Sequence, residues 1–352
     1  MLTIRKAIPV KAIANLFDAN GRATWSTITL VLGIAAVQSI CIYAGAVVDD
    51  TLWLPNEGDG FLEHYGVWAI LATDPLLIIA TGFAYRRFQI AINTLPLSTK
   101  KQTQKAFDQT VKTYLNYINM NKSSIFVYYL LVVFGFLCWL NNIRLTVEPT
   151  ETYGNDVFDS SQYVWGYYAN KVNLFTSWVV VYPIVGFLLV SMSLSIRLIL
   201  LRLTSANAIA LNVLHPDGCY GMRSLGILNL SLILPYALAY CVVFALLITH
   251  ENQYFTIIAA LVGLTVTMIS ASFLTIGPIS ILGRKIKDET YAKLEKKSRD
   301  YNGNNKTLIN RFAFERICYS TARASPYSKW IQTFLSTFRI LPVLLTASRL
   351  IV

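Results

Sequence analysis

One carboxylate, Asp74, lies well inside a long apolar segment of this 352-residue chain, and Pro75 follows it directly. A proline inside a helix removes one backbone hydrogen bond and frees a carbonyl oxygen in the preceding turn. An intramembrane acid beside such a break is typical of a route for ions or protons. The alternative is an acid near the outer boundary of the span, where its side chain reaches the lipid headgroups.

Lysine, arginine and tyrosine alternate in the segment that follows the last clear apolar stretch. Cations suit phosphate contacts and aromatic rings suit base stacking, so the pattern favours an anionic cytosolic ligand such as a nucleotide or oligonucleotide. The alternative is a solvated basic helix close to anionic lipid. The candidate ligand-binding residues are Lys285, Lys287, Tyr291, Lys293, Lys296, Lys297, Arg299, Tyr301 and Lys306.

The C-terminal segment 331–352 is apolar but carries Arg339, Pro342 and Arg349. An arginine that faces lipid near the middle of the bilayer is costly. The segment therefore either lies in the interface or crosses as a further helix with Arg339 facing water or protein. In the second case Arg339 and Arg349 would line a pore, and repeated positive rings would favour anions.

Small residues recur every four positions in the last clear apolar segment, at Gly263, Thr267, Ala271 and Thr275. Such a stripe lets another helix approach closely. It serves either packing within one subunit or a contact between subunits around an axis, and the second use predicts a homo-oligomer.

A cluster of turn-forming residues lies between two apolar segments. It predicts a tight structural turn with positive-φ positions. The residues are His215, Pro216, Asp217, Gly218 and Gly221. His215 and Cys219 are only two potential metal ligands, so no metal site is expected. No nucleophile, phosphate-binding loop or cofactor motif accompanies them, so the chain is not expected to be an enzyme or to need a cofactor.

This stretch resembles the His-Pro-Asp-x-x-Gly-Gly turn of uncharacterised multi-spanning bacterial membrane proteins, some of which resemble effectors of anti-phage defence operons. Tyr220 replaces the first of the paired glycines here, and the Ser325-Pro326-Tyr327 turn is a second point of similarity. The resemblance implies a membrane effector whose channel-like core is controlled by a cytosolic signal.

Long apolar segments must position all of these residues. Each is long enough to cross a hydrocarbon core of about 30 Å as a helix. The predicted spans are Trp25–Val48, Gly66–Tyr85, Ser124–Ile143, Val172–Ile196, Leu225–Thr249 and Tyr254–Leu282. The sequence thus predicts an all-α polytopic membrane protein with six transmembrane helices, or seven if the C-terminal segment also crosses.

The gaps between these spans alternate between basic and non-basic. Much of the net charge of +11 therefore falls on one side, and the positive-inside rule places the N-terminus and the basic tail in the cytoplasm. The expected location is the inner (plasma) membrane, with lipids as partners.

Three regions are predicted along the chain. Residues 1–283 form the transmembrane domain, with an amphipathic cytosolic helix at 98–119. Residues 284–330 form a basic helical cap that is too short to hold a large core. Residues 331–352 form the pore-like or interfacial segment.

These features favour an oligomeric ion channel or pore-type effector that an anionic cytosolic ligand gates. Two alternatives are also compatible with the sequence. One is an ion-coupled secondary transporter that uses Asp74, and the other is a lipid-modifying membrane enzyme with His215 and Asp217 at the inner interface. A scaffold or assembly role is also compatible with the sequence.

Overall fold

The described part of the chain is built from helices. The computed structural model describes residues 13, 15–17, 23–48, 65–96, 101–118, 122–147, 167–206, 208–209, 215, 219, 221–249, 281, 283–285, 287–297 and 306–321. Within these residues there is no β-strand, and an isolated bridge joins Phe17 to Ala23. The prediction of an all-α fold is confirmed for this part of the protein.

Long helices occupy five of the predicted spans. They are α2 (Trp25–Val48), α3 (Tyr65–Asn93), α5 (Lys122–Val147), the continuous run α8 (Tyr167–Phe175), η1 (Thr176–Val181) and α9 (Tyr182–Ser205), and α10 (Arg223–Thr249). The bounds of α2 match the prediction, whereas α3 continues eight residues beyond the predicted end at Tyr85 and takes in Arg86 and Arg87. The sixth predicted span, Tyr254–Leu282, falls almost wholly outside the described residues.

Three of the described helices are long and apolar enough to cross a membrane. Their apolar stretches are Val31–Val48, Lys171–Ser205 and Arg223–Cys241, and this number is smaller than the six spans predicted. A shorter apolar helical stretch, Ser124–Leu140, lies in α5. These stretches are taken from the described side chains alone, and the sixth predicted span falls almost wholly outside them.

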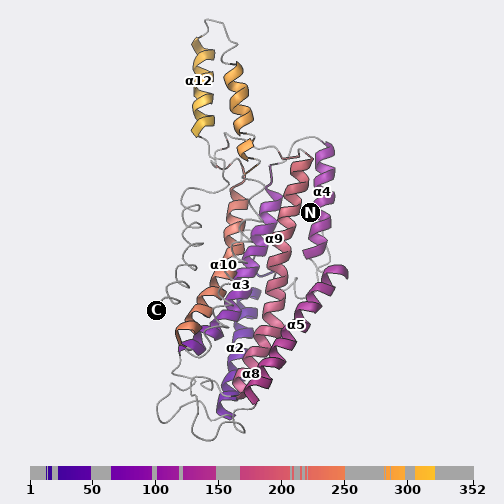
Figure 1. Cartoon of the computed structure of the whole chain (residues 1–352), viewed down its shortest axis with the longest axis vertical. Helices are drawn as coiled ribbons and strands as arrows, with labels where there is room; N and C mark the ends of the chain where they lie inside the picture. The colour runs from indigo at the N-terminus through magenta and orange to yellow at the C-terminus, as the bar shows by residue number, and fades with distance from the viewer. Residues whose placement is uncertain are drawn as a thin grey trace.

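Helix α3 lies at the centre of the bundle. It packs against α10 along much of its length and against α2 and α9 on other sides (Figure 1). Its inward positions include Ala84, Tyr85 and Phe88, which are fully or almost fully buried. Small and aromatic side chains alternate there, so neighbouring helices can approach α3 closely at several levels.

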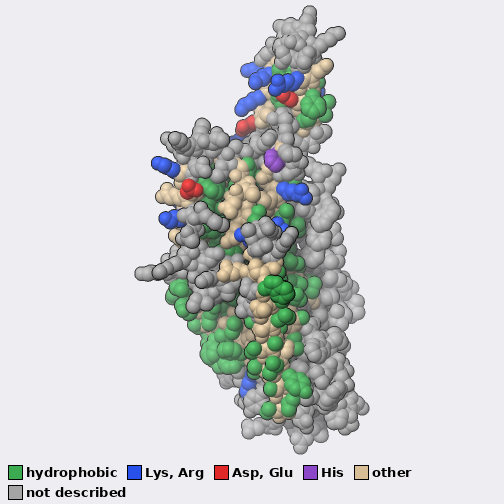
Figure 2. Space-filling model, turned by 180° about the vertical axis from the view of Figure 1, so that it is seen from behind, with side chains coloured by type: hydrophobic (Ala, Val, Ile, Leu, Met, Phe, Trp, Pro, Cys, Tyr) green, Lys and Arg blue, Asp and Glu red, His purple; other side chains and the backbone are tan. Residues whose placement is uncertain are grey.

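The outer surfaces of the bundle are apolar as well. Large exposed side chains cover α5, including Phe126, Phe134 and Leu137, and others lie along α2, including Leu32 and Ile40. Figure 2 shows hydrophobic side chains over the lower part of the molecule and most of the described Lys and Arg side chains toward the upper end. A large exposed apolar surface of this kind marks contact with lipid or a partner, and together with the apolar helices it fits a membrane protein.

The predicted amphipathic helix is present as α4 (Lys101–Ile118). Val111 and Ile118 are buried, while Lys105 and Lys112 are exposed. The apolar side of α4 packs against α9 at the upper end of the bundle, so it covers other protein segments (Figure 1).

Two further helices project beyond that end of the bundle (Figure 1). One comprises residues 283–285 and 287–297, and the other is α12 (Lys306–Thr321). The sequence places Ala313 and Ile317 on the apolar side of the second helix, but both are exposed, as is Phe314. The described side chains of this helical pair thus form little core of their own.

Candidate functional site

Asp74 lies in the interior of the bundle, directly before Pro75, which is inside the continuous helix α3. Its side chain is 1% exposed, although aspartate is among the residue types that are least often fully buried. Proline has no backbone N–H, so the carbonyl of Leu71 loses the donor that a regular helix would supply. A buried carboxylate therefore lies next to a turn of helix that lacks one regular backbone hydrogen bond.

Two side chains from other helices donate hydrogen bonds to Asp74. The Nε2 atom of Gln38 on α2 lies 3.0 Å from Oδ2 of Asp74, and the Oγ atom of Ser177 on η1 lies 2.8 Å from the same oxygen. Both donors are themselves buried. These two bonds join three separate segments of the chain at one carboxylate oxygen.

Asn173 extends the network to a fourth side chain. Its Oδ1 atom accepts a second hydrogen bond from Nε2 of Gln38, at 3.1 Å. Asn173 and Ser177 are four positions apart, so a helix places both side chains on one face. That face turns toward α2 and α3, and the four side chains of Gln38, Asp74, Asn173 and Ser177 form what we call the Asp74 network.

Ser177 belongs to a π-helical segment, Thr176–Val181. Wider turns of this kind are rare and occur frequently at functional sites. Helix α5 approaches this segment at Gly135, where a Cβ atom would collide with the carbonyl oxygen of Trp178. The backbone of α5 thus packs closely against one side of the π-helical segment at Gly135. On its other side, Ser177 donates to Asp74.

Two acceptor atoms of the Asp74 network remain without a hydrogen-bond donor among the described residues. They are Oδ1 of Asp74 and Oε1 of Gln38, and both are buried. A buried polar atom without a partner costs free energy, and a buried carboxylate costs more unless a cation or a proton offsets it. The network thus has the oxygen-rich composition that suits a proton or a small hard cation, and no described Lys or Arg is paired with it.

The network lies deep in the bundle when its depth is measured along the helices. Asp74 is nine residues after the start of α3, which corresponds to about 14 Å at 1.5 Å per residue. Gln38 is ten residues before the end of α2, or about 15 Å from the same side. In both helices the network residue therefore lies far from the helix end. This depth argues against the alternative in which the Asp74 side chain reaches the lipid headgroups.

The predicted basic patch is partly described. Lys285, Lys287, Tyr291, Lys293, Lys296 and Lys297 lie on the first cap helix, where Lys293, Lys296 and Lys297 are exposed. Lys285 and Glu289 are paired within that helix at 3.9 Å. Lys306 begins α12, and Arg299 and Tyr301 lie outside the described residues.

The predicted turn contains one confirmed positive-φ glycine. Gly221 has φ +82°, and the imidazole of His215 lies beside it, 3.6 Å from the position that a Cβ atom would take. Cys219 is buried and its carbonyl accepts a hydrogen bond from the backbone N–H of Met222. Pro216, Asp217 and Gly218 lie outside the described residues.

Several other predicted site residues also fall outside the described part of the chain. They are the small-residue stripe Gly263, Thr267, Ala271 and Thr275, and the C-terminal residues Arg339, Pro342 and Arg349. Among the residues that are described, no group of three His, Cys, Asp or Glu side chains is arranged to hold a metal ion.

Asp74 is predicted from the sequence, whereas Gln38, Asn173 and Ser177 are not. Glutamine, asparagine and serine inside or beside an apolar span are the signal that could have found them, because each polar group there needs a partner. Sequence alone does not say which partner, since Gln38 and Asn173 are 135 positions apart.

Comparisons with known proteins find no matching protein family, no similar curated protein and no similar solved structure.

Proposed function

We propose that the protein is an ion-coupled membrane transporter and that Asp74 is the residue that binds the coupling proton or cation. The observation that carries this proposal is the burial of the Asp74 carboxylate among Gln38, Asn173 and Ser177, deep in a helical bundle. The proposal includes six membrane spans with the N-terminus in the cytoplasm, as the charge pattern of the sequence predicts.

The energetics of the carboxylate support this role. An ionised carboxylate is costly in a low-dielectric interior, and the hydrogen bonds from Gln38 and Ser177 offset only part of that cost. Binding of a proton or a small cation offsets the remainder. A site whose charge must be neutralised by a mobile ion is suited to couple ion binding to a change in helix packing.

The two irregular helices beside Asp74 supply a means of movement. Pro75 interrupts the hydrogen bonding of α3, and the π-helical segment η1 interrupts the regular geometry between α8 and α9. Such breaks are tolerated in membrane helices where other groups satisfy the backbone. Asp74 therefore lies beside a missing backbone hydrogen bond in α3 and beside the π-helical segment η1, so a change in its charge would act on both.

Solid-supported-membrane recordings test this proposal. Purified protein in liposomes would be exposed to rapid jumps in proton or Na⁺ concentration, and the charge displaced across the membrane would be recorded. We expect a transient current in the wild-type protein for the ion that binds at Asp74. We expect Asp74→Asn to abolish it, because an amide does not exchange a proton or attract a cation as a carboxylate does.

Asp108→Asn is the matched control, because Asp108 is exposed on α4 and lies outside the network. This variant should retain the wild-type current. An equal current in the wild-type protein and in Asp74→Asn would contradict the proposal, and so would the absence of current for both ions.

A second candidate function is an oligomeric channel or pore-type effector that an anionic cytosolic ligand gates. The observation that favours it is the exposed basic surface of the first cap helix at Lys293, Lys296 and Lys297. A nucleotide or short oligonucleotide would pair with these ammonium groups. A role in bacterial anti-phage defence would follow from the resemblance of the 215–221 turn.

Planar-bilayer recording tests the second candidate. Discrete current steps that appear when oligonucleotides are added on the cap side would support it. The variant with Lys293, Lys296, Lys297 and Arg299 all replaced by glutamine should then lose the response to the ligand and keep its insertion in the membrane. An unchanged response in that variant would exclude the cap as the sensor.

A further inference from the structure

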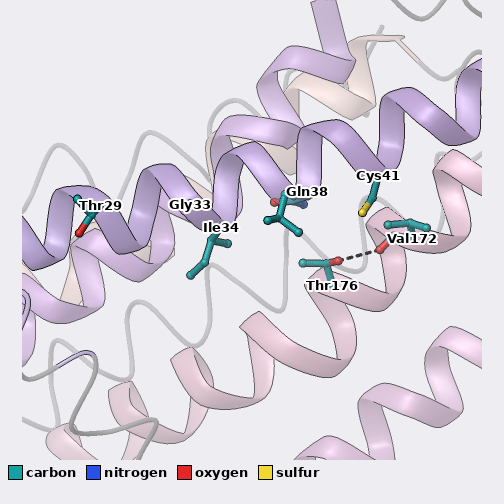
Figure 3. Close-up of a pocket in the computed structure, with 8 residues that line it drawn as sticks. Thr29, Gly33, Ile34, Gln38, Cys41, Val172 and Thr176 are labelled. Atoms are coloured by element: carbon teal, nitrogen blue, oxygen red, sulfur yellow. Dashed lines mark hydrogen bonds between the residues drawn. The ribbon is translucent and has the colours of Figure 1, made fainter.

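An ion can reach Asp74 only along a path through the bundle, and the pocket beside the network is not that path. This pocket of about 420 Å³ lies between α2 and the α8–η1 run, and Gln38 lines it whereas Asp74 does not (Figure 3). The hydroxyls of Thr29 and Thr176 in its wall donate to carbonyls of their own helices, at 3.0 and 2.9 Å. The wall is otherwise mainly apolar, so it does not lead an ion to the carboxylate.

A buried hydroxyl on α3 indicates a different direction. Thr81 follows Asp74 by seven positions, close to two full helical turns, so both side chains lie on nearly the same side of α3, about 10 Å apart along its axis. Thr81 is 0% exposed, and its Oγ1 atom has no hydrogen-bond partner among the described residues. A buried hydroxyl without a partner costs free energy unless water or another polar group reaches it. Thr81 is therefore a polar group that a hydrated path from Asp74 toward the Asn93 end of α3 would pass.

The residue after Thr81 is covered by the chain that precedes α2. A Cβ atom at Gly82 would lie 2.6 Å from Cδ1 of Leu16 and 3.3 Å from Cε2 of Phe17, so glycine is what lets these two side chains approach the helix. Leu16 is 1% exposed. The ring of Phe17 meets that of Phe83 edge to face, with centroids 5.9 Å apart. Leu16 and Phe17 therefore cover α3 immediately beyond Thr81.

Two hydrogen bonds hold these covering residues to the start of α2. The backbone N–H of Thr24 donates to the carbonyl of Leu16 at 3.0 Å, and the hydroxyl of Thr24 donates to the carbonyl of Asn15 at 2.9 Å. Thr24 directly precedes α2, and α2 carries Gln38, which donates to Asp74. A shift of α2 in response to the charge of Asp74 would therefore also move Leu16.

We propose that Leu16 and Phe17 form a gate that closes the path between Asp74 and the end of the bundle that is predicted to be cytoplasmic. The inference rests on the proposed transport function, because a transporter must open its ion site to one side of the membrane at a time. In this structure the gate is closed, since Leu16 and Thr81 are both buried. A shift of α2 relative to α3 would withdraw Leu16 from Gly82 and admit water to the Thr81 hydroxyl.

Cysteine accessibility tests the gate. Thr81→Cys would be introduced into a variant whose native cysteines are replaced by serine, and inside-out vesicles would be treated with a membrane-impermeant trimethylammonium methanethiosulfonate. We expect slow reaction while Gly82 and Leu16 are intact. Gly82→Ala should raise the reaction rate about tenfold or more, because the added methyl group collides with Leu16 only in the closed state. Leu16→Ala should raise it as well, because it removes the covering side chain without adding bulk to α3.

Two controls separate an open gate from a loosened bundle. Gly186→Ala should leave the rate of Thr81→Cys unchanged, because a Cβ atom at Gly186 meets nothing within 4 Å. Ser231→Cys is the control position, because Ser231 on α10 is buried and its hydroxyl donates to the carbonyl of Leu228 at 2.7 Å. Ser231→Cys should stay unreactive when it is combined with Gly82→Ala. If it reacts as fast as Thr81→Cys, the whole bundle has loosened and the gate is overturned.

The outcomes also separate this inference from the proposed function. An unchanged rate of Thr81→Cys labelling in both Gly82→Ala and Leu16→Ala would overturn the gate. An ion-driven current that is lost in Asp74→Asn would still support transport in that case, because the current does not depend on the labelling result. Faster labelling in both variants, with Ser231→Cys unreactive, would support the gate whichever ion drives the current.

Discussion

The Nε2 atom of Gln38 on α2 lies 3.0 Å from Oδ2 of Asp74 on α3, and the same nitrogen lies 3.1 Å from Oδ1 of Asn173 on α8. One carboxamide thus connects three helices in the interior of the bundle. Both N–H groups of this carboxamide donate hydrogen bonds, one to Asp74 and one to Asn173. A displacement of the Asp74 side chain would therefore change contacts of α2 and, through Gln38, of α8. This connection is the structural basis of the transport mechanism proposed here.

Replacement of Ser177 by alanine should destabilise the protein by removing one of the two donors to Asp74. The bond is 2.8 Å long and buried, and a hydrogen bond to a charged group is worth about 1.5–3 kcal/mol. Thermal unfolding in detergent should show a lower Tm than for wild type. Ser205→Ala is the control, because Ser205 is exposed and its hydroxyl donates only to the carbonyl of Leu201 in its own helix. Equal Tm values for the two variants would contradict a structural role for the Ser177 bond.

Replacement of Gly135 by alanine should be more harmful than the same change at Gly186. A Cβ atom at Gly135 would collide with the Trp178 carbonyl of η1, whereas one at Gly186 meets nothing within 4 Å. Overpacking of this kind costs about 1–3 kcal/mol. Gly186→Ala should leave Tm unchanged or raise it, because alanine is the better helix former. If both variants unfold at the same temperature, α5 does not approach the π-helical segment as described.

At Gly221, alanine should destabilise the protein more than asparagine. The residue has φ +82°, a conformation that costs most side chains about 1–2 kcal/mol but that asparagine adopts more readily. Chemical denaturation in mixed micelles would rank the two variants against wild type. A ranking with alanine above asparagine would indicate that the turn changes its conformation when a side chain is added.

The predicted orientation can be checked by labelling single cysteines introduced into a variant whose native cysteines are replaced by serine. Lys105→Cys on α4 and Lys293→Cys on the cap helix should react with a membrane-impermeant maleimide only from the cytoplasmic side. Val48→Cys, at the C-terminal end of α2, should react from the outside. All three positions are exposed. Labelling of Lys105→Cys and Val48→Cys from the same side would refute the orientation.

The helices were more predictable from the sequence than the site. The predicted apolar span Trp25–Val48 has the bounds of α2. The amphipathic helix predicted at 98–119 corresponds to α4, because a helix must bury its apolar side. The extension of α3 past Tyr85 was not predicted, since Arg86 and Arg87 suggested that the apolar span had ended. Helix α3 nevertheless continues to Asn93, and Arg87 lies over the ring of Phe83, 4.9 Å from its centre.

The partners of Asp74 could not be predicted because they depend on packing between distant segments. Ser177 is 103 positions from Asp74, and nothing in the local sequence around either residue encodes their contact. The π-helical geometry at Thr176–Val181 also leaves no pattern in the sequence, because its residues are ordinary components of an apolar span.

Infrared difference spectroscopy on the carboxyl group of Asp74 tests the central claim most directly. Protein reconstituted in lipid would be switched between two proton or Na⁺ concentrations while the carboxyl bands are recorded. We predict a carboxyl band that changes with the coupling ion and that is absent in Asp74→Asn but present in Asp108→Asn. Identical difference spectra for the wild-type protein and Asp74→Asn would show that Asp74 does not bind the ion, and would contradict the account.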